Sequence, residues 1–268
     1  MVIPIAIRTL GLKNSGQYLA AQMELEYSVI YGKHAVEELF ESQKPIAKVF
    51  IHNRLSGPFE IQVREICKER NIPLVRTEIE YLNRFSGGRN HQGIIATTSP
   101  IEFQDLEVII PHLYENDRSP LFVILDHIKD VRNFGAIARS AEVFGANAII
   151  IPRKNSAAIN NDAVKTSSGA LLHIPVCRVS DIKDTIQLLQ NNGIQVFAST
   201  LFTEKMIGEM DFKGPAAVIL GAEGKGVQKE LVLASDHSFK IPQHGKTDSL
   251  NVSVSAGIML YEIIRQRG

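Results

Sequence analysis

The chain has 268 residues, of which 44% are hydrophobic and 22% charged, and its formal net charge at pH 7 is zero. This composition is that of an ordinary globular protein with one large or two small domains. No apolar run approaches the roughly 18 residues of a membrane span. The even charge balance argues against a protein coated in positive charge, so any nucleic acid would have to bind local patches.

Residues 1–26 show no clear periodicity, and we predict a loosely held arm there. Their apolar start is short and is interrupted by Pro4 and Arg8. We therefore do not interpret it as a signal peptide, and we expect a cytoplasmic protein. The two cysteines, Cys67 and Cys177, lie far apart and in no metal-ligand spacing. Free buried thiols are the expectation, rather than a disulfide or a metal site.

Between residues 27 and 99, short helical and extended patterns alternate. They predict helices at 34–42, 59–70 and 78–85 and strands at 47–52, 72–75 and 93–99. This alternation indicates a small α/β layer domain. Residues 100–119 contain three acidic residues up to Glu107 and end in a polar stretch, so we predict a linker there.

From residue 120 to the end, the alternation resumes. The uninterrupted apolar run at 121–125 is typical of a buried parallel strand. The following patterns predict helices at 135–144, 181–191 and 249–266 and strands at 148–151, 194–198 and 216–220. We expect a parallel α/β sheet that binds ligands beyond the carboxyl ends of its strands.

Residues 125–146, LDHIKDVRNFGAIARSAEVFGA, join the first of these strands to a helix. Asn133 lies just before the predicted helix and is interpreted either as its N-cap or as a site residue. Arg139 lies one turn inside the helix. It is either a surface arginine with a buried aliphatic stem or a site residue.

Residues 218–227, VILGAEGKGV, are a buried strand that runs into a glycine-rich turn. Glycines let the backbone approach a ligand closely. Within this segment, the GxGxxG spacing of dinucleotide-binding folds and the GK[ST] of phosphate-binding loops are both absent. The segment is either a plain turn or another kind of cofactor loop, and Glu223 within it is either a surface carboxylate or a site residue.

The last stretch, residues 239–266, contains a polar loop followed by a helical apolar stripe. The first turn of such a helix has free backbone N–H groups that can meet a ligand. Ser249 and Asn251 lie at this junction. They are either helix caps or site residues that face the same crevice as the two preceding loops.

Together and in this order, these three stretches resemble the signature motifs of the SpoU family of RNA ribose 2′-O-methyltransferases, in the SPOUT class. The resemblance covers essentially all of 119–268. Two earlier stretches, YGKHAVEELF (31–40) and GGRNHQGIIA (87–96), resemble a small RNA-binding domain that is similar to certain ribosomal proteins. That domain precedes the methyltransferase domain in the family's 23S rRNA guanosine methyltransferases.

The resemblance implies an α/β protein with a small RNA substrate-binding domain at 27–99 and a methyltransferase domain at 120–268. In the family, the second domain contains a deep trefoil knot and forms homodimers through its knot helices. The implied cofactor is S-adenosylmethionine, with no metal and no membrane. The cofactor contacts carried over from the family are Gly221, Ile241, Leu250 and, less directly, Thr200.

The family's residues around the reacting ribose are all matched, by Asn133, Arg139, Glu223, Ser249 and Asn251. Arg139 corresponds to the family's proposed base for the 2′-hydroxyl. A free guanidinium, however, has a pKa above about 12. The alternative is that Arg139 grips a neighbouring phosphate and polarises the hydroxyl. The position that is often proline in the family holds Val131, which leaves this loop freer.

The resemblance also places RNA-binding side chains in two loops of the first domain. Unpaired RNA is read by stacking and by contacts to base edges, which these side chains can make. The alternative for each is a solvated loop residue. The expected RNA-binding residues are Lys33, His34, Arg89, Asn90, His91 and Gln92.

The leading hypothesis is therefore an enzyme that methylates a guanosine ribose in 23S rRNA. Three alternatives remain, namely a tRNA ribose methyltransferase, a methyltransferase that acts on an adenosine of rRNA, and a ribosome-assembly factor that binds RNA without catalysis. The domain at 27–99 weighs against the tRNA enzyme, because stand-alone tRNA members of the family usually lack it. Family members that act on rRNA adenosine have a similar domain layout, so the adenosine alternative stays open. The complete set of family site residues weighs against the assembly factor.

Overall fold

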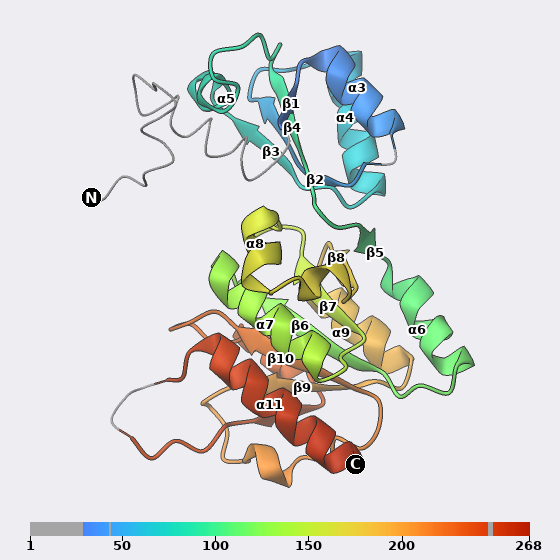
Figure 1. Ribbon diagram of the computed structural model, residues 1–268, viewed down its shortest axis with the longest axis vertical. Helices are drawn as coiled ribbons and strands as arrows, with labels where there is room; N and C mark the ends of the chain where they lie inside the picture. Colours follow the sequence, from blue (N-terminus) through green and yellow to red (C-terminus); the bar gives the residue numbers. More distant parts are fainter. Residues whose placement is uncertain (1–28, 43, 246–248) are drawn as a thin grey trace. The chain divides into compact units, whose positions relative to one another are not determined.

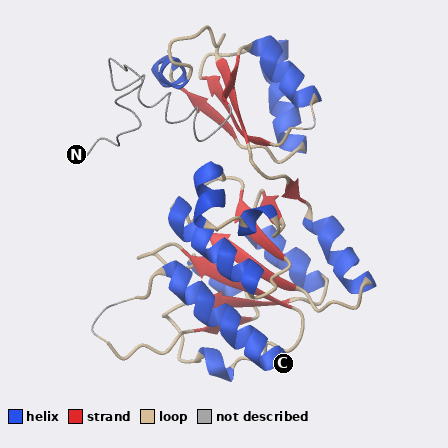
Figure 2. Ribbon diagram, viewed as in Figure 1, coloured by secondary structure: helices blue, strands red, loops and turns tan. Residues whose placement is uncertain are grey.

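The computed structural model describes residues 29–42, 44–245 and 249–268, so the predicted arm at 1–26 lies outside the described residues. The chain divides into two compact units, one ending at Pro100 and one running from Ile101 to Gly268. Figure 1 shows their elements along the chain, and Figure 2 shows the helices and strands of each. Among the described helices, none combines the length and the apolar character that a membrane crossing requires.

The first unit is a four-stranded sheet with helices on both faces. Its strands, in the spatial order β1-β4-β2-β3, are β1 (Val29–Tyr31), β4 (Ile94–Thr98), β2 (Ile46–His52) and β3 (Leu74–Thr77). Its helices are α3 (Lys33–Glu41), α4 (Pro58–Glu69) and α5 (Ile79–Phe85). Strand β4 runs antiparallel to both neighbours, and only β2 and β3 are parallel. The predicted α/β layer is confirmed.

Two clusters of apolar side chains hold the first unit together. On one face, Val36 of α3 and Val63 of α4 pack against the sheet. On the other face, Leu82 and Phe85 of α5 cover Phe50, and the Phe50 and Phe85 ring centroids are 5.0 Å apart. The helices pack where apolar residues recur at helical spacing, because that spacing places them on one side of each helix.

The second unit is built on a seven-stranded sheet in which every neighbouring pair is parallel. Its strands, in spatial order, are β11 (His237–Phe239), β9 (Gln195–Ser199), β10 (Ala216–Gly221), β6 (Leu121–Asp126), β7 (Ala148–Pro152), β8 (Val176–Val179) and β5 (Phe103–Gln104). Strand β6 is buried along its whole length, as its apolar run predicts.

Helices cover both faces of this sheet. They are α6 (Leu106–Glu115), α7 (Val131–Val143), α8 (Asn161–Thr166), α9 (Ile182–Asn191), α10 (Lys229–Ala234) and α11 (Val252–Arg267), with short 3₁₀ turns η1 (Ala170–Leu172) and η2 (Ile207–Glu209). Helices α7 and α11 lie side by side on one face, where they pack on Val123 and Leu125. Helices α6 and α9 pack on Phe122 and Ile124 of the opposite face. The parallel α/β fold is confirmed, and the trefoil knot stays a prediction.

The segment 100–119 differs from the predicted linker, because it contains a strand and a helix of the second unit. Strand β5 pairs in parallel with β8, and the guanidinium of Arg178 lies 3.4 Å from the centre of the Phe103 ring. Helix α6 begins after Asp105, whose carboxylate accepts a hydrogen bond from the backbone N–H of Glu107. Its apolar stripe is Leu106, Ile110 and Leu113. Asp105, one of the acidic residues on which the linker prediction was based, is therefore the N-cap of a helix.

Candidate active site

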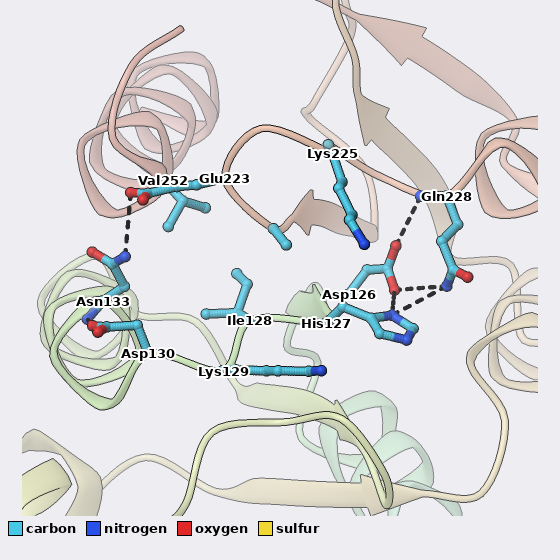
Figure 3. Close-up of a pocket in the computed structure, with 12 residues that line it drawn as sticks. Asp126, His127, Ile128, Lys129, Asp130, Asn133, Glu223, Lys225, Gln228 and Val252 are labelled. Carbon is cyan, nitrogen blue, oxygen red and sulfur yellow. Dashed lines mark hydrogen bonds and ion pairs between the residues drawn. The ribbon is translucent and has the colours of Figure 1, made fainter.

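Two loops at adjacent strand ends form a cavity of about 420 Å³ in the second unit. Strands β6 and β10 are parallel neighbours, with Asp126 beside Gly221 at their carboxyl ends. The loop after β6 leads into α7, and the loop after β10 is the glycine-rich turn. The lining residues are Asp126, His127, Ile128, Lys129, Asp130, Asn133, Ala222, Glu223, Lys225, Gly226, Gln228 and Val252 (Figure 3).

Three of the predicted site residues meet at one side of this cavity. The carboxylate Oε1 of Glu223 accepts a hydrogen bond from Asn133 Nδ2 at 3.2 Å and another from Asn251 Nδ2 at 2.7 Å. Asn251 Nδ2 also donates to Asn133 Oδ1 at 3.0 Å. Figure 3 shows the contact between Asn133 and Glu223 across the cavity. These residues come from α7, the glycine-rich turn and the start of α11. Tertiary folding therefore joins all three loops at one point.

Asn251 is both a helix cap and a member of this cluster. Helix α11 begins at Val252, three residues later than predicted, and Asn251 Oδ1 accepts a hydrogen bond from the backbone N–H of Ser253 at 2.9 Å. The cap uses the amide oxygen, whereas the cluster uses the amide nitrogen. Ser249 lies before the helix in an exposed position and does not cap it.

Asn133 is not the cap of α7, because that helix begins earlier than the sequence suggests. Its cap is Asp130, whose carboxylate accepts a hydrogen bond from the backbone N–H of Asn133 at 2.8 Å. Asn133 therefore lies in the first turn, and its side chain is available to Glu223. The apolar pattern placed the helix start near Gly135 because residues 130–133 are mostly polar.

Arg139 lies further along α7 and is exposed to solvent. It does not line the cavity. Within the described part of the chain, the Arg139 side chain forms no ion pair or hydrogen bond. Its guanidinium is therefore free to contact a ligand that approaches along α7. The structure does not bring it into the Asn133–Glu223–Asn251 cluster.

The residues expected to contact the cofactor gather at one edge of the sheet, beside the cavity. Thr200 follows β9, Gly221 ends β10, and Ile241 follows β11. Because these three strands are parallel neighbours, their carboxyl ends lie at the same edge. Leu250 is exposed and directly precedes the Asn251 cap. None of the four lines the cavity itself.

Gly221 is required by the close packing of the glycine-rich turn. A Cβ atom at this position would lie 1.9 Å from the backbone carbon of Gly226. The turn closes through a hydrogen bond from Gly226 N to Ala222 O at 2.8 Å. The absence of a side chain therefore lets the turn fold back over the end of β10 in close backbone contact.

A buried carboxylate that the sequence analysis missed anchors the far side of the turn. Asp126 is fully buried, and it accepts hydrogen bonds from Gln228 N at 2.8 Å and from Gln228 Nε2 at 2.9 Å. Nδ1 of His127, a residue with a φ of 58°, lies 2.5 Å from the same carboxylate. The sequence did contain a signal for Asp126, because it is a charged residue that directly follows an apolar run. A carboxylate that is buried at such a position needs hydrogen-bond partners.

In the first unit, the two loops expected to bind RNA lie next to each other. The side-chain Oε1 of Gln92 accepts a hydrogen bond from the backbone N–H of Lys33 at 2.9 Å, at the start of α3. The guanidinium of Arg89 lies 5.7 Å from the centre of the Tyr31 ring. His34, Asn90 and Arg89 are exposed. Cations, amides and an aromatic ring thus share one surface.

His91 differs from this expectation, because its side chain is buried in the domain. Its Nε2 is 3.0 Å from Asn83 Oδ1, and its Nδ1 accepts a hydrogen bond from Gly93 N, also at 3.0 Å. Burial, together with the nearby His52, lowers the pKa of His91. With both ring nitrogens in use, His91 shapes the loop and has no polar atom left for RNA.

Comparison with known protein families identifies both units. Residues 120–261 match the model of the SpoU rRNA Methylase family, and residues 29–104 match that of the RNA 2′-O ribose methyltransferase substrate binding domain. YacO of Bacillus subtilis (strain 168), assigned to the TrmH family of tRNA/rRNA methyltransferases, is 32% identical over 246 residues. The match covers 91% of this chain and 98% of YacO.

Solved structures show the same fold. An AdoMet-bound rRNA methyltransferase from Sinorhizobium meliloti aligns with a TM-score of 0.58 and 22% identity, over 98% of this chain and 97% of that one. The TrmH/SpoU tRNA modifying enzyme of A. aeolicus aligns with a TM-score of 0.52 and 31% identity, over 60% of this chain and 84% of that one. With its two family domains and its converging motif residues, the chain belongs to the SpoU rRNA methylase family.

Proposed function

We propose that this protein uses S-adenosylmethionine to methylate the ribose 2′-hydroxyl of a guanosine in 23S rRNA. The convergence of Asn133, Glu223 and Asn251 on one hydrogen-bonded cluster beside the cavity carries the proposal. A side chain that served only as a helix cap would not need partners from two other loops. The proposal also draws on the family membership and on the AdoMet-bound relative from Sinorhizobium meliloti.

The cofactor would supply an electrophilic methyl group on a sulfonium. The backbone at Gly221, with Ile241, Leu250 and Thr200, would hold it at the edge where β9, β10 and β11 end. The feature of this chain that supports this placement is the glycine-rich turn, which packs closely against the end of β10 at Gly221. Holding two reactants in one orientation accounts for a large part of the rate in a displacement of this kind.

The cluster would orient the ribose. Oε1 of Glu223 is occupied by two amide N–H donors, which fixes the carboxylate plane. Oε2 takes no part in these hydrogen bonds, so it would accept one from a ribose hydroxyl. Ser249, exposed beside Asn251, would contact the same nucleotide or the end of the cofactor.

Arg139 would act on the 2′-hydroxyl and the phosphate beside it. Its exposed guanidinium can donate to a phosphate and polarise the neighbouring hydroxyl. A neutral guanidine acting as base would need strong desolvation, and Arg139 is exposed. We therefore favour the role of a phosphate clamp, with the proton leaving through phosphate or water.

The adjacent loops of the first unit would select the RNA. Lys33, His34, Arg89, Asn90 and Gln92 would contact unpaired nucleotides there, and His91 would keep the loop in shape. An arginine beside an aromatic ring suits stacking on a base.

A homodimer is part of the proposal. Helices α7 and α11 present large apolar side chains to solvent: Val143 is 68% exposed, Val254 50%, Ile258 37% and Tyr261 59%. A second copy would remove this surface from water. Sedimentation equilibrium would show a dimer for the native protein and a monomer for Ile258→Asp if this surface is the interface.

The experiment that tests the function is methyl transfer from labelled S-adenosylmethionine to separate 23S rRNA and tRNA transcripts. We expect label in a 2′-O-methylguanosine of 23S rRNA, and no label with Arg139→Ala. Label in tRNA alone would establish a tRNA ribose methyltransferase, the second candidate function. The 31% identity to the tRNA modifying enzyme of A. aeolicus is the observation that favours this second candidate.

Retained RNA binding with no transfer to either RNA, while the cofactor binds, would contradict the catalytic role. The protein would then be interpreted as a ribosome-assembly factor that binds RNA without catalysis. The same assay on ribosomal particles separates this outcome from an enzyme that needs an assembled substrate.

A further inference from the structure

We propose that Lys129 and Lys225 form an anion subsite that holds a backbone phosphate of the substrate RNA beside the target ribose. The inference rests on the proposed function and assigns a substrate contact to two residues that are not among the five site residues carried over from the family. The two lysines come from the loops after β6 and β10, and both line the same cavity. Figure 3 shows the Lys225 side chain extending toward the loop that carries Lys129.

All three acidic side chains that line the cavity already accept hydrogen bonds from other groups of the protein. Asp126 accepts from Gln228 and lies against His127, and Asp130 caps α7. Glu223 accepts from Asn133 and Asn251. Hydrogen bonds to neutral donors leave these carboxylates charged, but within the described residues none of the three forms an ion pair with Lys129 or Lys225.

The two lysines stand in contrast to these carboxylates. In the segments that the structure describes, neither Lys129 nor Lys225 forms an ion pair or a side-chain hydrogen bond. Among the described residues, the cavity therefore has two ammonium groups without a carboxylate partner, and these can bind a ligand. A lysine ammonium has three donors and binds phosphate as a point charge. An anion is the ligand that this arrangement accepts.

The RNA phosphate is favoured over the other anion at hand, the carboxylate of the cofactor. The residues expected to hold the cofactor, which include Gly221 and Ile241, do not line the cavity. Asn133 and Glu223, expected to orient the ribose, do line it. A phosphate in the same cavity would lie within one nucleotide of that ribose. The apolar walls formed by Ile128 and Val252 suit the sugar rather than a second charge.

The test uses the full chain with Lys129→Ala, Lys225→Ala and the double variant. Lys229→Ala is the matched control, because Lys229 is an exposed lysine that does not line the cavity. Binding of a 23S rRNA transcript is measured against salt concentration, and binding of S-adenosylmethionine is measured separately by calorimetry. Each lost phosphate contact lowers the slope of log affinity against log salt by about 0.7 for single-stranded RNA.

We expect the double variant to bind RNA about tenfold more weakly at low salt, with a salt slope lower by about 0.7, because one phosphate contact is lost. Cofactor affinity should stay unchanged, and Lys229→Ala should match the wild type. A double variant with the wild-type slope, or a wild type that does not bind the transcript, would overturn the subsite. Loss of cofactor affinity instead would assign the lysines to the cofactor carboxylate and reject the RNA phosphate.

Failure of the subsite and failure of the proposed function are distinguishable, because binding is measured without methyl transfer. If the wild type methylates RNA and the slopes are equal, only the subsite fails. If the wild type methylates neither RNA but the double variant still loses slope, the proposed reaction fails and the anion subsite stands.

Discussion

The first-unit loops that we propose to bind RNA and the cavity of the second unit use their polar groups differently. In the first unit, His91 and Gln92 bond to groups of their own domain, where they shape a loop and the start of α3. In the second unit, Asn133 and Asn251 meet on Glu223 from widely separated parts of the chain. A polar residue whose hydrogen bonds stay within its own domain stabilises the conformation of its loop. Polar residues from separate loops that bond to one another beside a cavity form a candidate site.

Breaking the crevice cluster should have the largest effect. Asn251→Ala removes both the α11 cap and the donor to Glu223. We expect methyl transfer to fall about 10²- to 10³-fold, the cost of losing one positioned donor in an active site. Single-turnover rates of transfer to RNA measure the loss.

Asn251→Ser is the matched control, because serine keeps a capping oxygen but lacks the amide donor. The serine variant should recover about 1 kcal/mol of stability in chemical unfolding while remaining slow. Recovery of the full rate by serine would show that Asn251 acts only as a cap.

Gly221→Ala tests whether the glycine-rich turn depends on close backbone contact. The added Cβ would overlap the backbone of Gly226, which cannot move as a flexible side chain can. We expect a loss of about 3 kcal/mol in the free energy of unfolding of the second unit, at the upper end for overpacking.

The control for this change is Gly208→Ala, since a Cβ at Gly208 meets no atom within 4 Å. Urea unfolding of both variants compares them. Equal stabilities would mean that the turn relaxes and that Gly221 has no packing role.

His91→Ala and His34→Ala compare a buried and an exposed histidine from the two loops that we propose to bind RNA. Loss of the His91 hydrogen bonds should cost about 1–3 kcal/mol of stability in the first unit. His34, whose side chain is 94% exposed, should leave stability unchanged and alter only RNA binding. Unfolding curves followed by a probe in the first unit separate the two effects.

The pH dependence of His91 follows from its lowered pKa in the folded state. The folded state favours the neutral ring, so this contribution is complete above the unfolded pKa of about 6.5. It is lost as pH falls from there through the folded pKa, because the unfolded chain then binds more protons. A His91→Ala variant should show a smaller loss of stability on acidification than the native protein, and an identical pH profile would contradict this.

Val131→Pro should have the smallest effect. Val131 is the first residue of α7 after the Asp130 cap, a position where proline is favoured. Restricting the unfolded chain should add about 0.4–1 kcal/mol of stability. Thermal unfolding measures the gain, and a loss would show that this backbone does not suit proline.

The sequence alone determined the parallel α/β architecture of the second unit. Its central strands β6, β7 and β10 are apolar runs buried on both faces, and its helices have apolar stripes, which are local properties of the chain. It also selected Asn133, Glu223 and Asn251, through their motif context. Helix starts were less well determined, because polar caps such as Asp130 hide the first turn.

Only the tertiary structure decided which polar residues work together. Asn133 and Asn251 are 118 positions apart, and no local pattern shows that both reach Glu223. Asp126 is a partner of Gln228 only because β6 and β10 end side by side. The burial of His91 and the place of 100–119 in the second unit depend likewise on what packs against them. Periodicity records which face of an element is apolar, whereas the contacts between distant loops are set by the order of strands in the sheet.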